Sequence, residues 1–168
     1  MKIKVLLLVL SLFSFNAVLA KKSAKDGDKV SVRYVGKLKD GRVFDHNIDK
    51  KDLTFTLGDG NLIKNFDRAV IGMKEGETKT VEIPAKDAYG EFNDKMVFRI
   101  PAEQLPKGTK EGDTLKYRIG GGYHPVRIIH IDEKDVFIDA NHKLAGKDLV
   151  FDITLKDIAK PDDSKDKA

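Results

Sequence analysis

The chain has 168 residues, of which 40% are hydrophobic, 35% charged and 8% aromatic, and its formal net charge is +4. Because the sequence contains no Cys, a disulfide scaffold, a cysteine nucleophile and thiolate metal sites are excluded. Basic and acidic residues are interspersed rather than clustered, so we expect no nucleic-acid partner.

The N-terminus has the pattern of a secretory signal peptide. Lys2 and Lys4 form a positive segment, residues 5–15 form an apolar run, and small residues precede a cleavage site after Ala20. The apolar run is shorter than the roughly 20 residues of a membrane span, although an uncleaved anchor is the alternative. We expect removal of residues 1–20, export to the periplasm or the medium, and no stable membrane insertion afterwards.

The following chain is predicted to form short strands and one short helix. Alternation of apolar and polar residues predicts strands at residues 30–35, 43–44, 53–57, 78–83 and 149–155. The Asp40-Gly41 dipeptide predicts a hairpin turn between the first two. The apolar spacing becomes helical between Leu62 and Val70, with Asn61 as the expected N-cap and Gly72 as the C-terminal stop.

A second set of strand signals lies between the two halves of this pattern. It predicts strands at residues 96–100, 114–119, 126–131 and 136–138, separated by Gly- and Pro-rich turns. We therefore expect a small β-rich lobe at residues 97–140, inserted into the domain that the first set of strands and the helix form. Residues 159–168 are expected to form a polar, disordered tail.

No catalytic motif stands out in the sequence. The four His residues, His46, His124, His130 and His142, have no metal-ligand spacing, so we expect surface histidines and no metal site. No Gly-x-Ser-x-Gly segment supports a serine hydrolase. The turn at residues 58–60 lacks the glycine spacing and the Lys of a phosphate-binding loop.

Six segments, in this order, carry a resemblance to a known family. They are Val32–Asp45, Phe55–Gly58, Leu62-Ile63 with Phe66, Gly72–Gly76, Asp87–Gly90 and Leu149–Asp152. Together they resemble FKBP-type peptidyl-prolyl cis–trans isomerases over residues 25–158. Within that family the chain is similar to the SlyD-like branch, which carries an extra lobe in its flap. In this sequence the extra lobe ends at Asp139–Gly146, where the chain returns to the isomerase-like domain.

The resemblance implies an α+β fold that is mainly antiparallel β. Its isomerase domain, residues 25–90 and 142–158, is expected to be a half-barrel wrapped on one short helix, with the insert-in-flap domain at residues 97–140. The implied catalytic residues are Tyr34, Asp45, Tyr89 and Phe151. The implied substrate-binding residues are Phe44, Leu62, Ile63 and Phe66, the last of which replaces a Trp found in many relatives.

The implied activity is rotation about X–Pro bonds without a cofactor. Peptide rotation costs ~18–20 kcal/mol, and an apolar pocket favours the twisted amide over the more charge-separated planar form. The resemblance implies that the Tyr89 hydroxyl holds the substrate carbonyl while Tyr34 and Asp45 fix the pocket wall.

The expected partners are unfolded or proline-containing polypeptides, and we expect a monomer. One alternative is a holdase chaperone without isomerase activity, which the presence of Tyr89 and Phe151 argues against. The other is a metallochaperone, which is disfavoured because the C-terminal tail contains neither His nor Cys.

Overall fold

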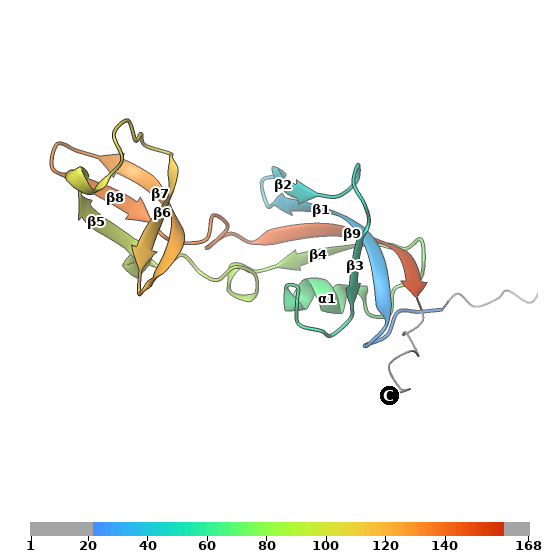
Figure 1. Cartoon of the computed structure of the whole chain (residues 1–168). Helices are drawn as coiled ribbons and strands as arrows, with labels where there is room; N and C mark the ends of the chain where they lie inside the picture. The colour runs from blue at the N-terminus through green and yellow to red at the C-terminus, as the bar shows by residue number, and fades with distance from the viewer. Residues whose placement is uncertain (1–21, 160–168) are drawn as a thin grey trace, which may run out of the picture.

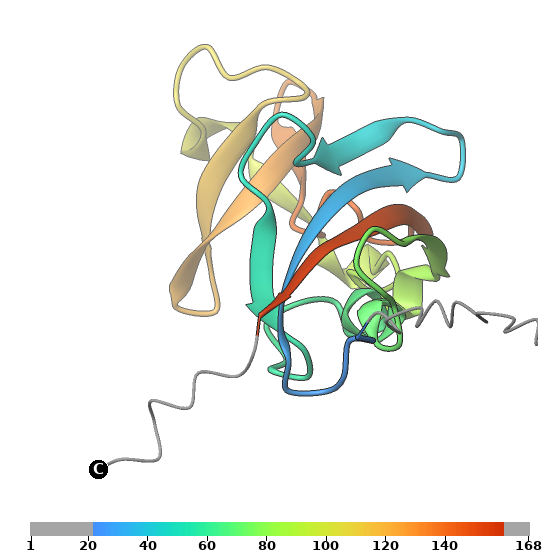
Figure 2. The same cartoon turned by 90° about the vertical axis from the view of Figure 1, so that its right-hand side faces the viewer.

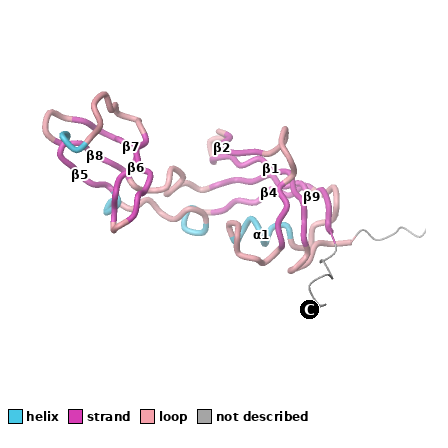
Figure 3. The backbone as a smooth tube through the Cα atoms, viewed as in Figure 1, coloured by secondary structure: helices cyan, strands magenta, loops and turns pink. Residues whose placement is uncertain are grey.

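The computed structural model describes residues 22–159. The expected signal peptide and nearly all of the expected tail lie outside this range. The described residues form two antiparallel sheets at opposite ends of an elongated molecule, and two crossings of the chain connect them (Figure 1). Strands and loops make up most of the backbone (Figure 3). No helix within residues 22–159 is long and apolar enough to cross a membrane.

The larger sheet has five strands. They are β1 (Lys29–Leu38), β2 (Val43–His46), β3 (Leu53–Thr56), β4 (Thr78–Ile83) and β9 (Leu149–Ala159). Their order is β2-β1-β9-β4, and β3 also pairs with β1. Strands β1 and β9 pair along their whole length, from Lys29 opposite Ala159 to Leu38 opposite Leu149. The first and last strands of the described chain therefore form the centre of this sheet.

The hairpin turn predicted at Asp40-Gly41 is confirmed. Strands β1 and β2 pair in an antiparallel register that runs from Val35 opposite His46 to Lys37 opposite Val43. Gly41 has a φ of 85°, which a residue without a Cβ adopts at little cost.

The larger sheet curves around the single α-helix of the described chain (Figure 2). This helix, α1 (Lys64–Val70), begins later than the sequence pattern predicts, so Asn61 as its N-cap is wrong. Ile63 occupies the cap position with φ of −54° and ψ of 122°, and the Asn61 N–H instead donates to Asp59 Oδ1 at 2.9 Å. This local turn competes with the helix for the backbone N–H. The predicted stop at Gly72 is confirmed, with φ of 85°.

A single core lies between α1 and the larger sheet. Phe66, Ala69 and Val70 of the helix are buried there. On β9, Leu149, Phe151, Ile153 and Leu155 alternate with more exposed residues, as the sequence pattern predicts for this strand. The burial of these side chains holds the helix in the curve of the sheet.

The smaller sheet forms the inserted lobe. Its strands are β5 (Val97–Pro101), β6 (Thr114–Ile119), β7 (Gly122–Ile131) and β8 (Asp135–Asp139). Their order is β5-β8-β7-β6, and all the pairs are antiparallel. The buried hydrophobic residues of this lobe are Ile100, Val126, Ile128, Val136 and Ile138. The mainly antiparallel α+β fold expected from the sequence is therefore confirmed.

Two crossings at residues 84–96 and 140–148 run side by side between the sheets (Figure 1). The first contains the short 3₁₀ helices η1 (Ala85–Asp87) and η2 (Asp94–Met96), and η3 (Ala102–Gln104) follows β5. Hydrogen bonds join the crossings: Gly146 N–H donates to Gly90 O at 2.8 Å and Ala140 N–H to Met96 O at 2.9 Å. The Asn141 side chain accepts from Asn93 N–H and donates to Asn93 O. The crossings therefore form one connected segment.

Candidate active site

A cavity of about 340 Å³ opens at the surface of the larger lobe. Its lining comes from β1, β2, β3, α1 and the residues before it, the first crossing and β9. The lining residues are Tyr34, Phe44, Asp45, Leu53, Asn61, Leu62, Ile63, Phe66, Tyr89 and Phe151. All eight site residues implied by the resemblance therefore lie around one cavity, and the structure adds Leu53 and Asn61 to them.

Edge-to-face aromatic contacts form the apolar floor of the cavity. The ring centroid of Phe66 lies 5.1 Å from that of Phe151 and 5.7 Å from that of Tyr34, with interplanar angles of 82° and 87°. Phe44 contacts Phe151 in the same way at 5.6 Å. Each such pair contributes about 0.5–1.5 kcal/mol beyond burial. The floor is therefore a fixed apolar surface.

The close approach of two of these rings requires a glycine on β1. A Cβ atom at Gly36 would lie 2.7 Å from Phe44 Cζ and 2.9 Å from Phe151 Cε1, closer than the packed interior permits. Gly36 is not among the site residues that the resemblance implies. The available signal was a glycine inside a predicted strand, which often marks a close approach of another group.

The wall of the cavity is fixed by a tyrosine–aspartate pair. The Tyr34 hydroxyl donates to Asp45 Oδ2 at 2.7 Å. Burial, the hydrogen bond to Asp45 with its charge, and the neighbouring Tyr89 raise the pKa of Tyr34 to about 12. Tyr34 is therefore a neutral donor across the physiological pH range, and it occupies one carboxylate oxygen of Asp45.

A buried asparagine holds the backbone beneath this pair. Asn47 Oδ1 accepts from Tyr34 N–H at 2.7 Å, and its Nδ2 donates to Val32 O at 3.0 Å. Sequence reasoning missed Asn47, whose amide is recognisable as structural only once its burial is known. It fixes the loop after β2 to β1 and so positions the residues on both sides of the Tyr34–Asp45 bond.

Tyr89 lies at the rim of the cavity, on the first crossing. The residue is 41% exposed, and its hydroxyl has no hydrogen-bond partner among residues 22–159. By contrast, Phe66 and Phe151 are buried and belong to the core of the lobe. The cavity thus combines an apolar floor with one free donor at its mouth, an arrangement that suits a planar amide bond better than a charged substrate.

The four His residues lie apart from one another. His46 follows Asp45 on β2, His124 and His130 lie on β7, and His142 lies on the second crossing. His130 pairs with Glu111 at 2.8 Å. Within residues 22–159, no three His, Cys, Asp or Glu side chains lie together as metal ligands.

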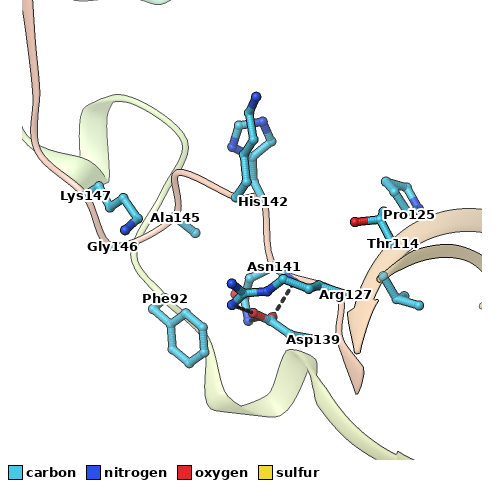
Figure 4. Close-up of a pocket in the computed structure, with 12 residues that line it drawn as sticks. Phe92, Thr114, Pro125, Arg127, Asp139, Asn141, His142, Ala145, Gly146 and Lys147 are labelled. Carbon is cyan, nitrogen blue, oxygen red and sulfur yellow. Dashed lines mark hydrogen bonds and ion pairs between the residues drawn. The ribbon is translucent and has the colours of Figure 1, made fainter. Parts of the chain in front are cut away.

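A larger cavity of about 580 Å³ lies at the junction of the two lobes (Figure 4). Arg127 and Asp139 form an ion pair in its wall at 3.3 Å. Its other lining residues include Asn141, Lys143 and Lys147, and none of the eight implied site residues is among them. Despite its smaller volume, the aromatic cavity is the better candidate for isomerisation, because its walls are apolar and convergent.

Comparison with known proteins identifies the family. A model of the FKBP-type peptidyl-prolyl cis-trans isomerase family matches residues 20–156. The short-type peptidyl-prolyl cis-trans isomerase of Methanocaldococcus jannaschii is 34% identical over 148 residues, which cover 80% of this chain and 93% of that protein.

Two bacterial relatives extend this similarity. A probable FKBP-type 16 kDa peptidyl-prolyl cis-trans isomerase of Pseudomonas fluorescens is 33% identical over 143 residues, covering 84% of this chain and 95% of that protein. The SlyD isomerase of Aeromonas hydrophila is 30% identical over 130 residues, covering 77% of this chain and 61% of that protein. The chain with this aromatic cavity belongs to the FKBP-type peptidyl-prolyl cis-trans isomerases.

Proposed function

We propose that this isomerase belongs to the SlyD-like branch and assists the folding of exported polypeptides by isomerising their X–Pro bonds. Its aromatic cavity acts on the proline, and its inserted lobe binds the unfolded chain around it. Similarity to SlyD isomerases of Aeromonas hydrophila and Vibrio cholerae, at 30% and 35% identity, supports the branch. The signal-peptide pattern at the N-terminus supports export.

In this proposal the cavity works without proton transfer or a covalent intermediate. The prolyl ring rests on the floor formed by Phe44, Phe66 and Phe151. Loss of water from the planar amide, whose charge separation is larger than that of the twisted amide, lowers the barrier to rotation. The Tyr89 hydroxyl donates to a substrate carbonyl, while Tyr34 holds Asp45 in the wall at 2.7 Å.

The composition of the inserted lobe supports a binding role for it. Leu115, Tyr117 and Ile119 on β6 are only half-buried, Ile129 is exposed, and Tyr123 is 73% exposed. Strand β6 is also an edge strand, with one side unpaired within the described chain. Exposed apolar side chains and an open strand edge are the features that bind an extended, unfolded polypeptide.

The observation that carries this division of labour is the separation of the two lobes. None of residues 97–139, the β5–β8 segment, lines the aromatic cavity. The inserted lobe also has a hydrophobic core of its own. Removal of the lobe therefore leaves the lining of the cavity unchanged.

The test is replacement of residues 97–140 by a short loop. We expect the shortened protein to retain isomerase activity on a short X–Pro peptide and to lose most of its acceleration of the refolding of a proline-limited protein. Unchanged activity on both substrates would assign some other role to the lobe. Loss of both activities with retained folding would place part of the catalytic site in the lobe.

Export and assembly are tested separately. We expect mass spectrometry of the exported protein to identify Lys21 as its first residue, and sedimentation to give a monomer. An intact N-terminus in the membrane fraction would instead support the uncleaved anchor.

A further inference from the structure

The rim residue Tyr89 packs against a histidine from the other crossing. The ring centroids of Tyr89 and His142 lie 3.9 Å apart, with an interplanar angle of 12°. This stack joins two residues that are 53 positions apart in the sequence. Because Tyr89 is 41% exposed, the stacked imidazole restricts a ring that its own segment leaves partly uncovered.

The position of His142 is itself fixed by the larger lobe. Its Nδ1 accepts from Leu144 N–H at 3.2 Å, and its carbonyl accepts from Ala145 N–H at 2.8 Å. Leu144 is buried in the core of the larger lobe, and Gly146 N–H donates to Gly90 O, next to Tyr89. The segment that carries the imidazole is thus attached to the core on one side and to the first crossing on the other.

The imidazole is not part of the junction cavity's ion pair. Figure 4 shows the His142 side chain projecting away from Arg127 and Asp139, which pair with each other. Its ring therefore has a stacking partner in Tyr89 and a backbone donor in Leu144, and neither of these two contacts enters the proposed isomerase mechanism.

We propose that His142 is a positioning residue of this isomerase: by stacking on Tyr89 it holds the Tyr89 hydroxyl over the prolyl cavity. The inference rests on the proposed contact of Tyr89 with the substrate carbonyl. His142 itself does not touch the substrate. Its contribution is to reduce the number of orientations that the Tyr89 ring adopts before the substrate arrives.

The hydrogen bond from Leu144 requires the neutral form of the ring. An imidazole nitrogen that accepts a hydrogen bond carries no proton, so the other nitrogen, Nε2, carries it. Protonation of Nδ1 replaces the acceptor by a second donor facing Leu144 N–H. The ring then leaves this position, and its stack on Tyr89 is lost.

The surroundings favour the neutral ring. Partial burial and, after it, the charge of Lys143 lower the pKa of His142 below its ordinary value. The other charged groups lining the junction cavity are Arg127, Lys147 and Asp139, and the carboxylate of Asp139 is engaged by Arg127. The phenol of Tyr89 covers a face of the imidazole. The stack is therefore formed at neutral pH and is lost as the pH falls through the lowered pKa.

The first experiment compares two substitutions at this position on a short X–Pro peptide. We expect His142→Ala to lower kcat/KM roughly two- to tenfold, the rate equivalent of one aromatic pair. His142→Phe keeps a stacking ring and is expected to retain more of the activity. The control is His124→Ala, at an exposed position of β7, which is expected to leave activity on the short peptide unchanged. Equal and full activity in all three variants would overturn the inference.

A double mutant separates positioning through Tyr89 from a general structural effect. We expect Tyr89→Ala to lower kcat/KM, and His142→Ala to have no additional effect in the Tyr89→Ala protein. An equal loss in both backgrounds would show that His142 acts elsewhere. If Tyr89→Ala leaves kcat/KM unchanged, the proposed substrate contact fails. If only His142→Ala leaves it unchanged, the positioning role alone fails.

The pH profile provides the second measurement. From about pH 8 down to well below the ordinary histidine pKa of about 6.5, we expect kcat/KM of the natural protein to fall at the acid end, and that of His142→Phe to stay level. Parallel profiles for the two proteins would contradict the role of the neutral imidazole.

Discussion

The two lobes of this isomerase differ in how many side chains they bury. Within residues 22–159, the core of the larger lobe contains sixteen buried hydrophobic residues and that of the inserted lobe five. Because apolar burial is the main favourable contribution to folding, we expect the larger lobe to contribute most of the free energy of folding. A small lobe of low stability opens more readily, which suits the proposed binding of many different unfolded chains.

The lobes also differ in how closely function and stability are connected. In the larger lobe, Phe66 and Phe151 belong to the core and also form the floor of the cavity. A substitution there changes catalysis and folding together. In the inserted lobe, Tyr123 and Ile129 are exposed, so binding can change there with little effect on the fold.

The largest effects are expected when one matched, buried side chain is removed from each core. This pair of substitutions tests whether the two lobes differ in stability. Ile153 on β9 and Ile138 on β8 are both fully buried, and truncation to Ala costs about 2–5 kcal/mol at such sites. We expect Ile153→Ala to lower the midpoint of thermal unfolding and both activities. We expect Ile138→Ala to increase hydrogen exchange in residues 97–139 only, and to reduce refolding assistance while peptide activity is retained.

The alternative outcome is one cooperative unit. If Ile138→Ala increases exchange equally in β1 and β9, the two lobes unfold together. Their separate cores would then not correspond to separate stabilities.

How far the sequence predicts this fold depends on the range over which each signal acts. The alternation on β9 and the Asp40-Gly41 turn are local patterns, and the structure has both where they are predicted. The local pattern predicts a start of α1 that is too early, with Asn61 as N-cap, because the Asn61 N–H donates to Asp59 Oδ1 and the helix begins only at Lys64. Such a competing turn has the same residue types as a helix cap.

The candidate site shows the same difference between features that local sequence motifs predict and features that depend on contacts between distant segments. The family resemblance identifies side chains that line the cavity, such as Phe44 and Tyr34, because these form its recognisable motifs. It does not identify Asn47, which acts by binding the backbone of Tyr34 and Val32. Nor does it identify the stack of His142 on Tyr89. Both depend on contacts between distant segments, and residue spacing does not encode those contacts.

The second expected effect concerns the glycine beneath the aromatic floor. In Gly36→Ala the new Cβ would lie within 3 Å of Phe44 and Phe151. Overpacking of this kind costs roughly 1–3 kcal/mol, and we expect displaced rings to lower peptide turnover as well. Unfolding followed by near-ultraviolet circular dichroism measures the loss of stability, and the peptide assay measures the loss of turnover. The matched control is Gly122→Ala on β7, where the nearest atom, His124 Nε2, is 3.4 Å away. If Gly36→Ala behaves like this control, the floor is more adaptable than its packing indicates.

A smaller effect is expected from removal of one hydroxyl group. Tyr89→Phe keeps the ring that stacks on His142 and removes the free donor. A neutral hydrogen bond contributes about 0.5–1.5 kcal/mol, so we expect kcat/KM to fall roughly two- to tenfold with no change in thermal stability. Exposed Tyr123 of the inserted lobe gives the control for loss of a hydroxyl: Tyr123→Phe is expected to leave kcat/KM on a short X–Pro peptide unchanged, because the lobe does not line the cavity. Full activity of Tyr89→Phe would remove the hydroxyl from the mechanism while leaving the ring in the cavity wall.

The smallest expected effect tests whether electrostatics adds to the difference in stability between the lobes. Asp152, on the central strand β9, accepts hydrogen bonds from Lys37 Nζ and from Thr80 Oγ1, the latter at 2.7 Å. The bonds from Lys37 and then Thr80 lower its pKa. A carboxyl whose pKa is lower in the folded than in the unfolded state stabilises the fold above its unfolded pKa. That contribution is lost as the pH falls through the folded pKa.

We therefore expect Asp152→Asn to reduce the free energy of unfolding by less than about 1 kcal/mol near neutral pH, because the pair is partly exposed. The difference from the natural protein should stay constant down to about pH 4, the ordinary pKa of Asp, and shrink below it. Asp157→Asn, on the same strand and without an ion pair in the described chain, is the control. Urea unfolding at a series of pH values measures both. A difference that persists in strong acid would show that the Asp152 side chain stabilises β9 through its shape rather than its charge, and the larger lobe's advantage would then rest on packing alone.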